Sequence, residues 1–149
     1  QSCKIKKSVV EKDEKESNLR KILNFGHTFA HAYEAGLNFT KKLNHGEAVI
    51  LGMRSALSFS LEKKIISKRE FDFVSNHFNN SKFPTSIQTY FSLKDIDKII
   101  SFMMRDKKNI SKKIKLMLIK GIGGPIIEKE FSDRVIKKFI QKNLMDYNL

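Results

Sequence analysis

The chain has 149 residues, 40% of them hydrophobic, which suits one globular domain with a packed core rather than two domains. No apolar run approaches the roughly 20 residues of a membrane span, and the single cysteine, Cys3, excludes an internal disulfide, so we expect a cytoplasmic protein without a membrane segment. The net charge of +13 comes from lysines spread along the whole chain without interleaved aromatic residues, which argues against nucleic-acid binding and suits an anionic small substrate.

Apolar spacing predicts helices through the first half of the chain. A helical lead-in is expected over residues 1–15, followed by a longer helix over residues 19–35. A polar loop then leads to a helix over residues 45–63, where Asn44 and Glu47 have the spacing of a capping box. Close approach of a neighbouring helix is permitted by small residues in that segment: Gly52, Ser55 and Ala56.

The second half is predicted to hold further helices around a short β element. The helices are expected over residues 67–79, 92–104 and 133–143. Residues 114–119 and 126–128 read as two short strands on either side of a glycine-rich turn. A phosphate-binding loop is the alternative for this turn, but its glycine spacing does not match the usual fingerprints. The sequence therefore predicts a mainly α, bundle-like domain with a short two-stranded β element near the C-terminus.

The longer helix expected after the lead-in carries an unusual polar face. At about 100° per residue, four side chains fall within roughly 60° of one another: Arg20, Asn24, His27 and His31. A surface helix usually presents Lys and Glu there, whereas guanidinium, amide and imidazole groups bind anions, hydroxyls or metals. A helical hairpin would bring His45 beside His27 or His31. Spacing alone leaves a metal site and three ordinary histidines equally open, and it favours His27 and His31 as the ligand pair.

Two longer motifs resemble the signature of one enzyme family. Residues 23–34 read LNFGHTFAHAYE, and residues 45–53 read HGEAVILGM. These runs are similar to LNxGHTFGHAIE and HGEAVxxGM of the 3-dehydroquinate synthases, with Ala30 in place of the usual glycine and Tyr33 in place of the common isoleucine. The resemblance covers most of the chain.

The resemblance implies that residues 1–149 are the C-terminal helical, metal- and substrate-binding domain of such an enzyme. The family converts 3-deoxy-arabino-heptulosonate 7-phosphate to 3-dehydroquinate and phosphate in the shikimate pathway of aromatic amino acid biosynthesis. It is a phosphate lyase that uses NAD and a divalent metal, zinc or cobalt. His27 and His45 become the metal ligands, in place of the pair that spacing favours, and the third ligand is a glutamate of the preceding domain.

The remaining implied residues bind and convert an anionic sugar-phosphate substrate. His31 and Asn24 match catalytic residues, and Glu16 is a weaker candidate for orienting the site. The implied substrate-binding residues are Lys6, Arg20, Asn24, His31, Lys107 and Lys108.

The resemblance also implies partners. The N-terminal α/β domain that binds NAD in this family has no counterpart in the sequence, which opens without an initiator methionine. We therefore expect part of a longer, homodimeric protein that is inactive as this chain alone, because hydride transfer needs the nicotinamide site. The alternatives are a domain of another sugar-phosphate cyclase, a domain of a metal-dependent alcohol dehydrogenase, and a basic helical nucleic-acid-binding module.

Overall fold

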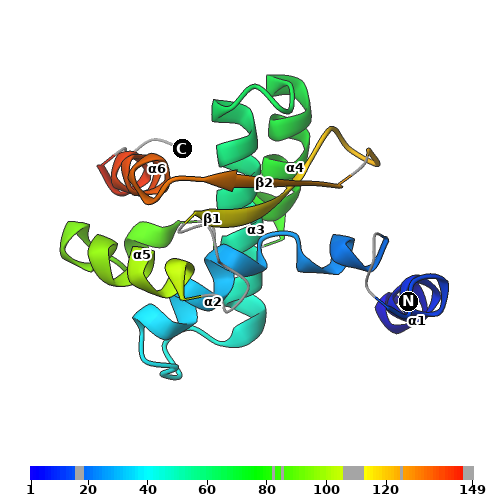
Figure 1. Cartoon of the computed structure of the whole chain (residues 1–149), viewed down its shortest axis with the longest axis horizontal. Coiled ribbons are helices and arrows are strands. Elements are labelled where there is room, and N and C mark those ends of the chain that lie inside the picture. The colour runs from blue at the N-terminus through cyan, green and yellow to red at the C-terminus, as the bar shows by residue number, and fades with distance from the viewer. Residues whose placement is uncertain (16–18, 82, 85, 106–112, 125, 146–149) are drawn as a thin grey trace.

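The computed structural model describes residues 1–15, 19–81, 83–84, 86–105, 113–124 and 126–145. Within these ranges it contains six α-helices, three short 3₁₀ helices and two strands, so the mainly α fold with one two-stranded element is confirmed (Figure 1). The elements are α1 (Ser2–Lys12), η1 (Leu19–Asn24), α2 (His27–Gly36), α3 (His45–Glu62), α4 (Lys68–Asn80), η2 (Ile87–Thr89), η3 (Leu93–Asp95), α5 (Ile96–Met104), β1 (Ile114–Ile119), β2 (Ile126–Phe131) and α6 (Asp133–Met145). None of the helices in the described ranges combines the length and apolar character that crossing a bilayer requires.

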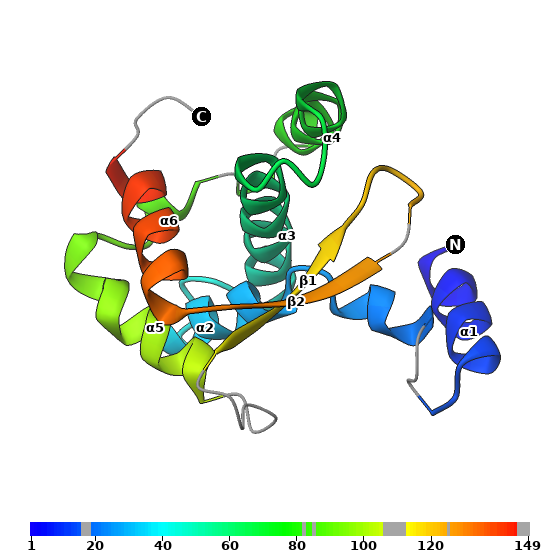
Figure 2. The ribbon, with the colours of Figure 1, turned by 45° about the horizontal axis from the view of Figure 1, so that its top comes forward.

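Helix α2 lies at the centre of the fold. It packs against α3 and α5, while α5 in turn contacts α6 and α3 contacts β1 (Figures 1 and 2). Phe29 and Tyr33 of α2 are fully buried in the main core cluster, together with Phe59 of α3 and Ile99 of α5. Burial of such large apolar side chains is the main stabilising contribution to the fold.

Strands β1 and β2 form an antiparallel hairpin whose register pairs Ile114 with Phe131 and Ile119 with Ile126. Burial alternates along β1, with Ile114, Leu116 and Leu118 facing the core. This period of two is the pattern of a strand with one covered face. The hairpin thereby joins the core beside α3.

Capping boxes set two helix starts, the predicted one at α3 and a second one at α4. At α3, the Asn44 side chain accepts a hydrogen bond from the Glu47 amide at 3.0 Å, and the Asn44 amide donates to the Glu47 carboxylate at 3.0 Å. Ser67 and Glu70 form the same reciprocal box at α4. Each box satisfies amides that a helix start leaves without partners.

The continuous helix predicted over residues 19–35 is wrong. Segment η1 ends at Asn24 and α2 begins at His27, with Gly26 between them in the left-handed region at φ +79°. A Cβ at Gly26 would lie 2.4 Å from the backbone nitrogen of Met53. The chain turns there because it passes directly against the α3 backbone, and only glycine permits both the contact and the left-handed conformation.

Candidate active site

The close crossing of α2 and α3 brings the two sequence motifs together. A Cβ at Gly52 would lie 2.3 Å from the carbonyl oxygen of Gly26 and 2.8 Å from the amide nitrogen of Ala30. Further along the same crossing, the Tyr33 hydroxyl and the Ser55 hydroxyl are 2.7 Å apart in a buried hydrogen bond. Backbone contact at one point and a buried polar pair at another hold the two helices in one relative position.

Three imidazoles meet beside this crossing. The ring centroids of His27 and His31 are 5.5 Å apart, those of His27 and His45 6.3 Å, and those of His31 and His45 6.4 Å. The predicted juxtaposition of His45 with the two histidines of the preceding helix is therefore confirmed. His27 is half-buried, whereas His31 and His45 are exposed, so the cluster opens toward solvent.

The electrostatics of the cluster favour the neutral form of His27. Burial lowers the pKa of His27, and the neighbouring His31 and His45 lower it further, against the raising effects of the Phe25 carbonyl and the Glu34 carboxylate. A neutral imidazole is the form that coordinates a metal ion.

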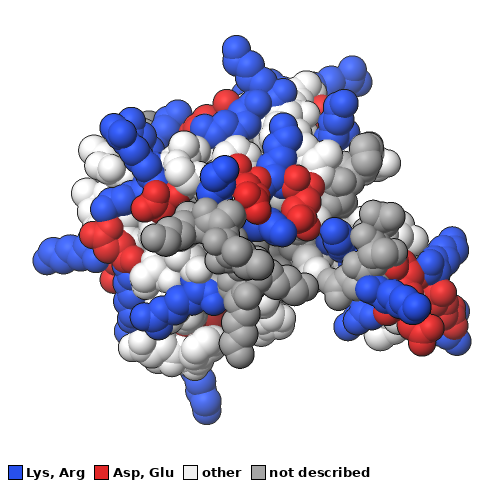
Figure 3. All heavy atoms as spheres, viewed as in Figure 1, with Lys and Arg blue, Asp and Glu red and all other residues white. Residues whose placement is uncertain are grey.

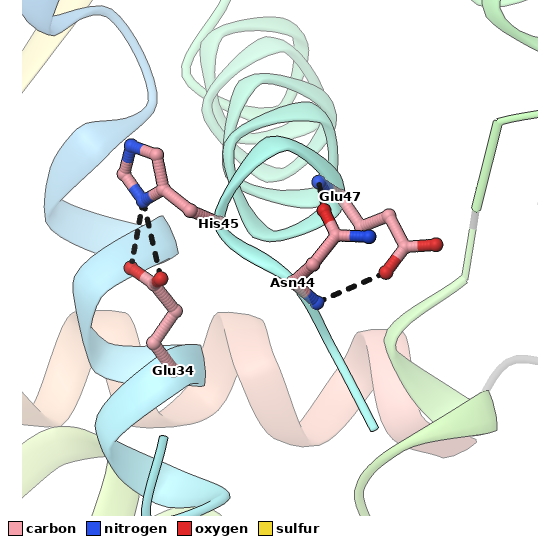
Figure 4. A network of polar contacts seen from close by, with 4 residues as sticks. All are labelled: Glu34, Asn44, His45 and Glu47. Atoms are coloured by element: carbon pink, nitrogen blue, oxygen red, sulfur yellow. Dashed lines mark hydrogen bonds and ion pairs between the residues drawn. The ribbon is translucent and has the colours of Figure 1, made fainter. Parts of the chain in front are cut away.

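Hydrogen-bond partners define which ring nitrogen carries the proton in two of the histidines. Nδ1 of His45 lies 3.1 and 3.2 Å from the two carboxylate oxygens of Glu34 (Figure 4). Nδ1 of His27 makes a longer contact of 3.4 Å with the carbonyl oxygen of Phe25. Carboxylate and carbonyl oxygens only accept hydrogen bonds, so each Nδ1 donates, and in the neutral ring Nε2 then carries the lone pair.

These imidazoles fit part of a metal centre. Two rings that hold one zinc ion tetrahedrally through Nε2 have centroids about 5 Å apart. The His27–His31 pair is near that separation, and the exposed ring of His45 must turn slightly toward His27 to reach it. Across the described ranges, no group of three or more His, Cys, Asp and Glu side chains is arranged to hold a metal ion. Within the described residues the cluster is therefore not a complete ligand set.

Two of the predicted cationic residues, Lys6 and Arg20, lie on α1 and η1 rather than on the helices that carry the imidazoles. Lys6 is exposed on α1, which packs mainly against η1. Arg20 lies in η1, where its amide donates to the Asp13 carboxylate at 2.9 Å and its guanidinium donates to the Glu14 carbonyl at 3.1 Å. The prediction that Arg20 and Asn24 share one helical face with His27 and His31 is wrong, because the helix is interrupted at Gly26.

Three of the predicted residues cannot be placed. Lys107, Lys108 and Glu16 lie outside the described residues. Sequence reasoning, in turn, gave no role to Glu34, which accepts the hydrogen bond of His45. The sequence contained a signal for Glu34 in its spacing. Glu34 follows His27 by seven positions and His31 by three, so it shares their helical face.

Comparison with known proteins shows to which family the sequence is related. A family model described as 3-dehydroquinate synthase C-terminal matches residues 1–109. The 3-dehydroquinate synthase of Pelagibacter ubique is 55% identical over 144 residues, which cover 97% of this chain and 39% of that protein. The enzyme of the same name from Endomicrobium trichonymphae is 40% identical over 147 residues, or 96% of this chain and 39% of its own length. The chain thus spans about two fifths of these curated relatives.

Solved structures show the same fold. A crystal structure of 2-deoxy-scyllo-inosose synthase superimposes with a TM-score of 0.75 at 22% identity, covering 93% of this chain and 38% of that chain. A second structure of that enzyme, complexed with carbaglucose-6-phosphate, NAD⁺ and Co²⁺, gives a TM-score of 0.72 at 24% identity with the same coverage. At these identities the likeness concerns the fold, and the assignment to a family rests on the sequence matches. The chain belongs to the 3-dehydroquinate synthase C-terminal family.

Proposed function

We propose that residues 1–149 are the C-terminal domain of a 3-dehydroquinate synthase, and that the rest of the longer protein is an N-terminal domain that binds NAD. The observation that carries this proposal is the imidazole cluster, in which the two sequence motifs of the family meet across the α2–α3 crossing. The 55% identity to the Pelagibacter ubique enzyme supports the same reaction, the conversion of 3-deoxy-arabino-heptulosonate 7-phosphate to 3-dehydroquinate and phosphate.

His27 and His45 are proposed as the protein ligands that this domain contributes to a zinc or cobalt ion. Both present Nε2 with its lone pair, as a ligand must. When bound, the metal polarises substrate oxygens and NAD accepts and returns a hydride. The 2-deoxy-scyllo-inosose synthase of the same fold that is complexed with NAD⁺ and Co²⁺ supports this pair of cofactors.

The remaining residues are proposed to hold the anionic ends of the substrate. Arg20 can bind a carboxylate with two parallel N–H donors, and Lys6 on α1 is proposed as a second cation. His31 and Asn24 are proposed to act beside the substrate phosphate, with His31 moving a proton at its exposed ring. Lys107 and Lys108 are the candidates for a further phosphate contact. Fixed cations and donors hold the substrate in one orientation through successive steps.

Histidine substitutions in the longer protein test the ligand assignment. We expect His27→Ala and His45→Ala to lose bound metal on dialysis, measured by elemental analysis, because each removes one of the two imidazole ligands. His31→Ala should retain metal and lose turnover, measured as formation of 3-dehydroquinate. His77→Ala is the matched control, since His77 is exposed on α4 and lies outside the cluster. Loss of metal from His31→Ala with retention in His45→Ala would overturn the assignment.

A product assay distinguishes the proposed reaction from that of another sugar-phosphate cyclase. The fold shared with 2-deoxy-scyllo-inosose synthase makes another sugar-phosphate cyclase the second candidate, and formation of an inosose rather than 3-dehydroquinate would select it. A nucleic-acid-binding module is disfavoured by the charge distribution. Figure 3 shows Lys and Arg side chains scattered over one face rather than gathered in one patch, with Asp and Glu side chains between them. The expected cytoplasmic location and homodimer stay predictions.

A further inference from the structure

Glu34 occupies a position that helix electrostatics alone do not favour. It lies in the last turn of α2, where the negative end of the helix dipole repels a carboxylate. Only 14% of its side chain is exposed, compared with 63% of the His45 side chain. The partner that compensates for this placement is His45, the first residue of α3, at the positive end of a second helix dipole.

The contact between Glu34 and His45 is two-pronged. Both carboxylate oxygens lie within 3.2 Å of Nδ1, and Figure 4 shows the His45 ring turned from the start of α3 toward the carboxylate on α2. The neighbouring carboxylate, Glu47, is engaged instead by the Asn44 amide in the capping box. Of these two acidic residues beside the start of α3, Glu34 is therefore the one that accepts the hydrogen bond of the His45 imidazole.

We infer that Glu34 is a positioning residue that holds His45 in the Nδ1-protonated tautomer and so presents its Nε2 to the metal ion. The inference rests on the proposed function, in which His45 is a ligand. An exposed imidazole otherwise rotates and exchanges its proton between both nitrogens. A carboxylate on Nδ1 removes both freedoms and increases the electron density that Nε2 offers to a cation.

The two proposed ligands therefore obtain their orientation in different ways. The ring of His27 is half-buried, and its Nδ1 contacts the carbonyl oxygen of Phe25. This contact lies next to the close approach of Gly26 to α3. The ring of His45 has little packing around it and depends on one charged partner. Removing Glu34 should consequently affect His45 far more than His27.

Metal affinity in the longer protein tests the inference. We expect Glu34→Ala to weaken Co²⁺ and Zn²⁺ binding about 10- to 100-fold, measured by competition with a chelator, because an outer-shell carboxylate typically contributes that much. Glu34→Gln keeps the shape of the side chain and one acceptor oxygen, so its loss should be smaller. Glu47→Gln removes the same charge from the same end of α3 without touching His45, and its affinity should equal that of the unmodified protein.

A second measurement determines the tautomer of His45 in the metal-free protein. Nitrogen NMR of ¹⁵N-histidine-labelled, metal-free protein at about pH 8.5, where imidazoles are neutral, should show Nδ1 of His45 protonated. In Glu34→Ala the proton should move toward Nε2, while the signals of His27 stay unchanged. An unchanged His45 tautomer in Glu34→Ala would overturn the inference.

The failure of this inference can be distinguished from failure of the proposed function. Metal loss in His45→Ala with unweakened binding in Glu34→Ala would overturn the role of Glu34 and leave His45 a ligand. Unchanged metal binding in His45→Ala would overturn the ligand assignment itself, and the role of Glu34 with it.

Discussion

The two groups of proposed site residues are held in the molecule by different means. The imidazoles stand on α2 and α3, which cross in backbone contact and bury Phe29, Tyr33 and Phe59 completely. The cationic residues Lys6 and Arg20 lie on α1 and η1, and both views place α1 at one side of the molecule, away from α5 and α6 (Figures 1 and 2). No residue of η1, which is described throughout, is buried, and Ile5 of α1 is 58% exposed.

The difference in burial between these two regions indicates which part of the proposed site is rigid. The positions of the two helices that carry the imidazoles are set by core packing, so these positions cannot change without disturbing the core. In α1 and η1 only Val9 is buried among the residues whose exposure is described, and the other contacts of Arg20 and Lys21 are polar and partly exposed, so they contribute much less free energy. We therefore expect the imidazole cluster to be preformed, whereas the position of Lys6 and Arg20 depends on small energies.

Gly52→Ala is expected to have the largest effect. Its Cβ would meet backbone atoms of Gly26 and Ala30 that cannot move without separating α2 from α3. We expect the free energy of unfolding to fall by about 3 kcal/mol, at the upper end of overpacking costs. Denaturant unfolding followed by circular dichroism measures this change.

Gly46→Ala is the matched control for that substitution. A Cβ at Gly46 would find only the Asn44 side chain, at 3.5 Å, and the position is exposed in the first turn of α3. This variant should be as stable as the unmodified chain or up to about 1 kcal/mol more stable, since alanine favours the helix. Equal stability of Gly52→Ala and Gly46→Ala would show that the crossing is not in backbone contact.

Tyr33→Phe is expected to have an intermediate effect. The Tyr33 hydroxyl pairs with Ser55 inside the α2–α3 crossing, and burial raises the pKa of Tyr33 well above its usual value, so the phenol stays protonated. Removing the hydroxyl leaves the Ser55 hydroxyl buried without its partner, at a cost of about 1 to 2 kcal/mol. Unfolding of Tyr33→Phe, Ser55→Ala and the double variant gives the coupling energy. Additive effects of the two substitutions would contradict the direct bond.

Glu128→Gln is expected to have the smallest effect, and it tests the contact between the β hairpin and η1. Glu128 on β2 contacts Lys115 at 3.0 Å and Lys21 of η1 at 3.4 Å, and these lysines, Lys115 foremost, hold the pKa of Glu128 below its usual value. The ion pairs are partly exposed, so their removal should cost about 0.5 kcal/mol at pH 7.

The pH dependence of this effect has a defined sign. A carboxyl whose pKa is lower in the folded protein contributes stability above its ordinary pKa of 4.5 and loses it as the pH falls through the folded value. The difference between Glu128→Gln and the unmodified protein should therefore be constant near neutral pH and shrink as the pH falls below 4.5. A difference that grows below pH 4.5 would contradict the assigned ion pairs.

Signals within a few residues were sufficient to predict most of the fold. The start of α3 follows from its capping box, in which Asn44 satisfies the first amides of the helix. The strands and the remaining helices follow from apolar periodicity. The sequence by itself also marked His27, His31 and His45 as a group, because motif and spacing both single them out.

Only the tertiary structure decided the break at Gly26 and the contact of Glu34 with His45. A helical pattern continues through Gly26, and what interrupts it is the backbone of α3, 26 positions further along at Gly52. The tautomer of His45 likewise depends on a carboxylate from another helix. Both features arise where two helices meet, and the relative placement of helices is set by packing over the whole core rather than by any local signal.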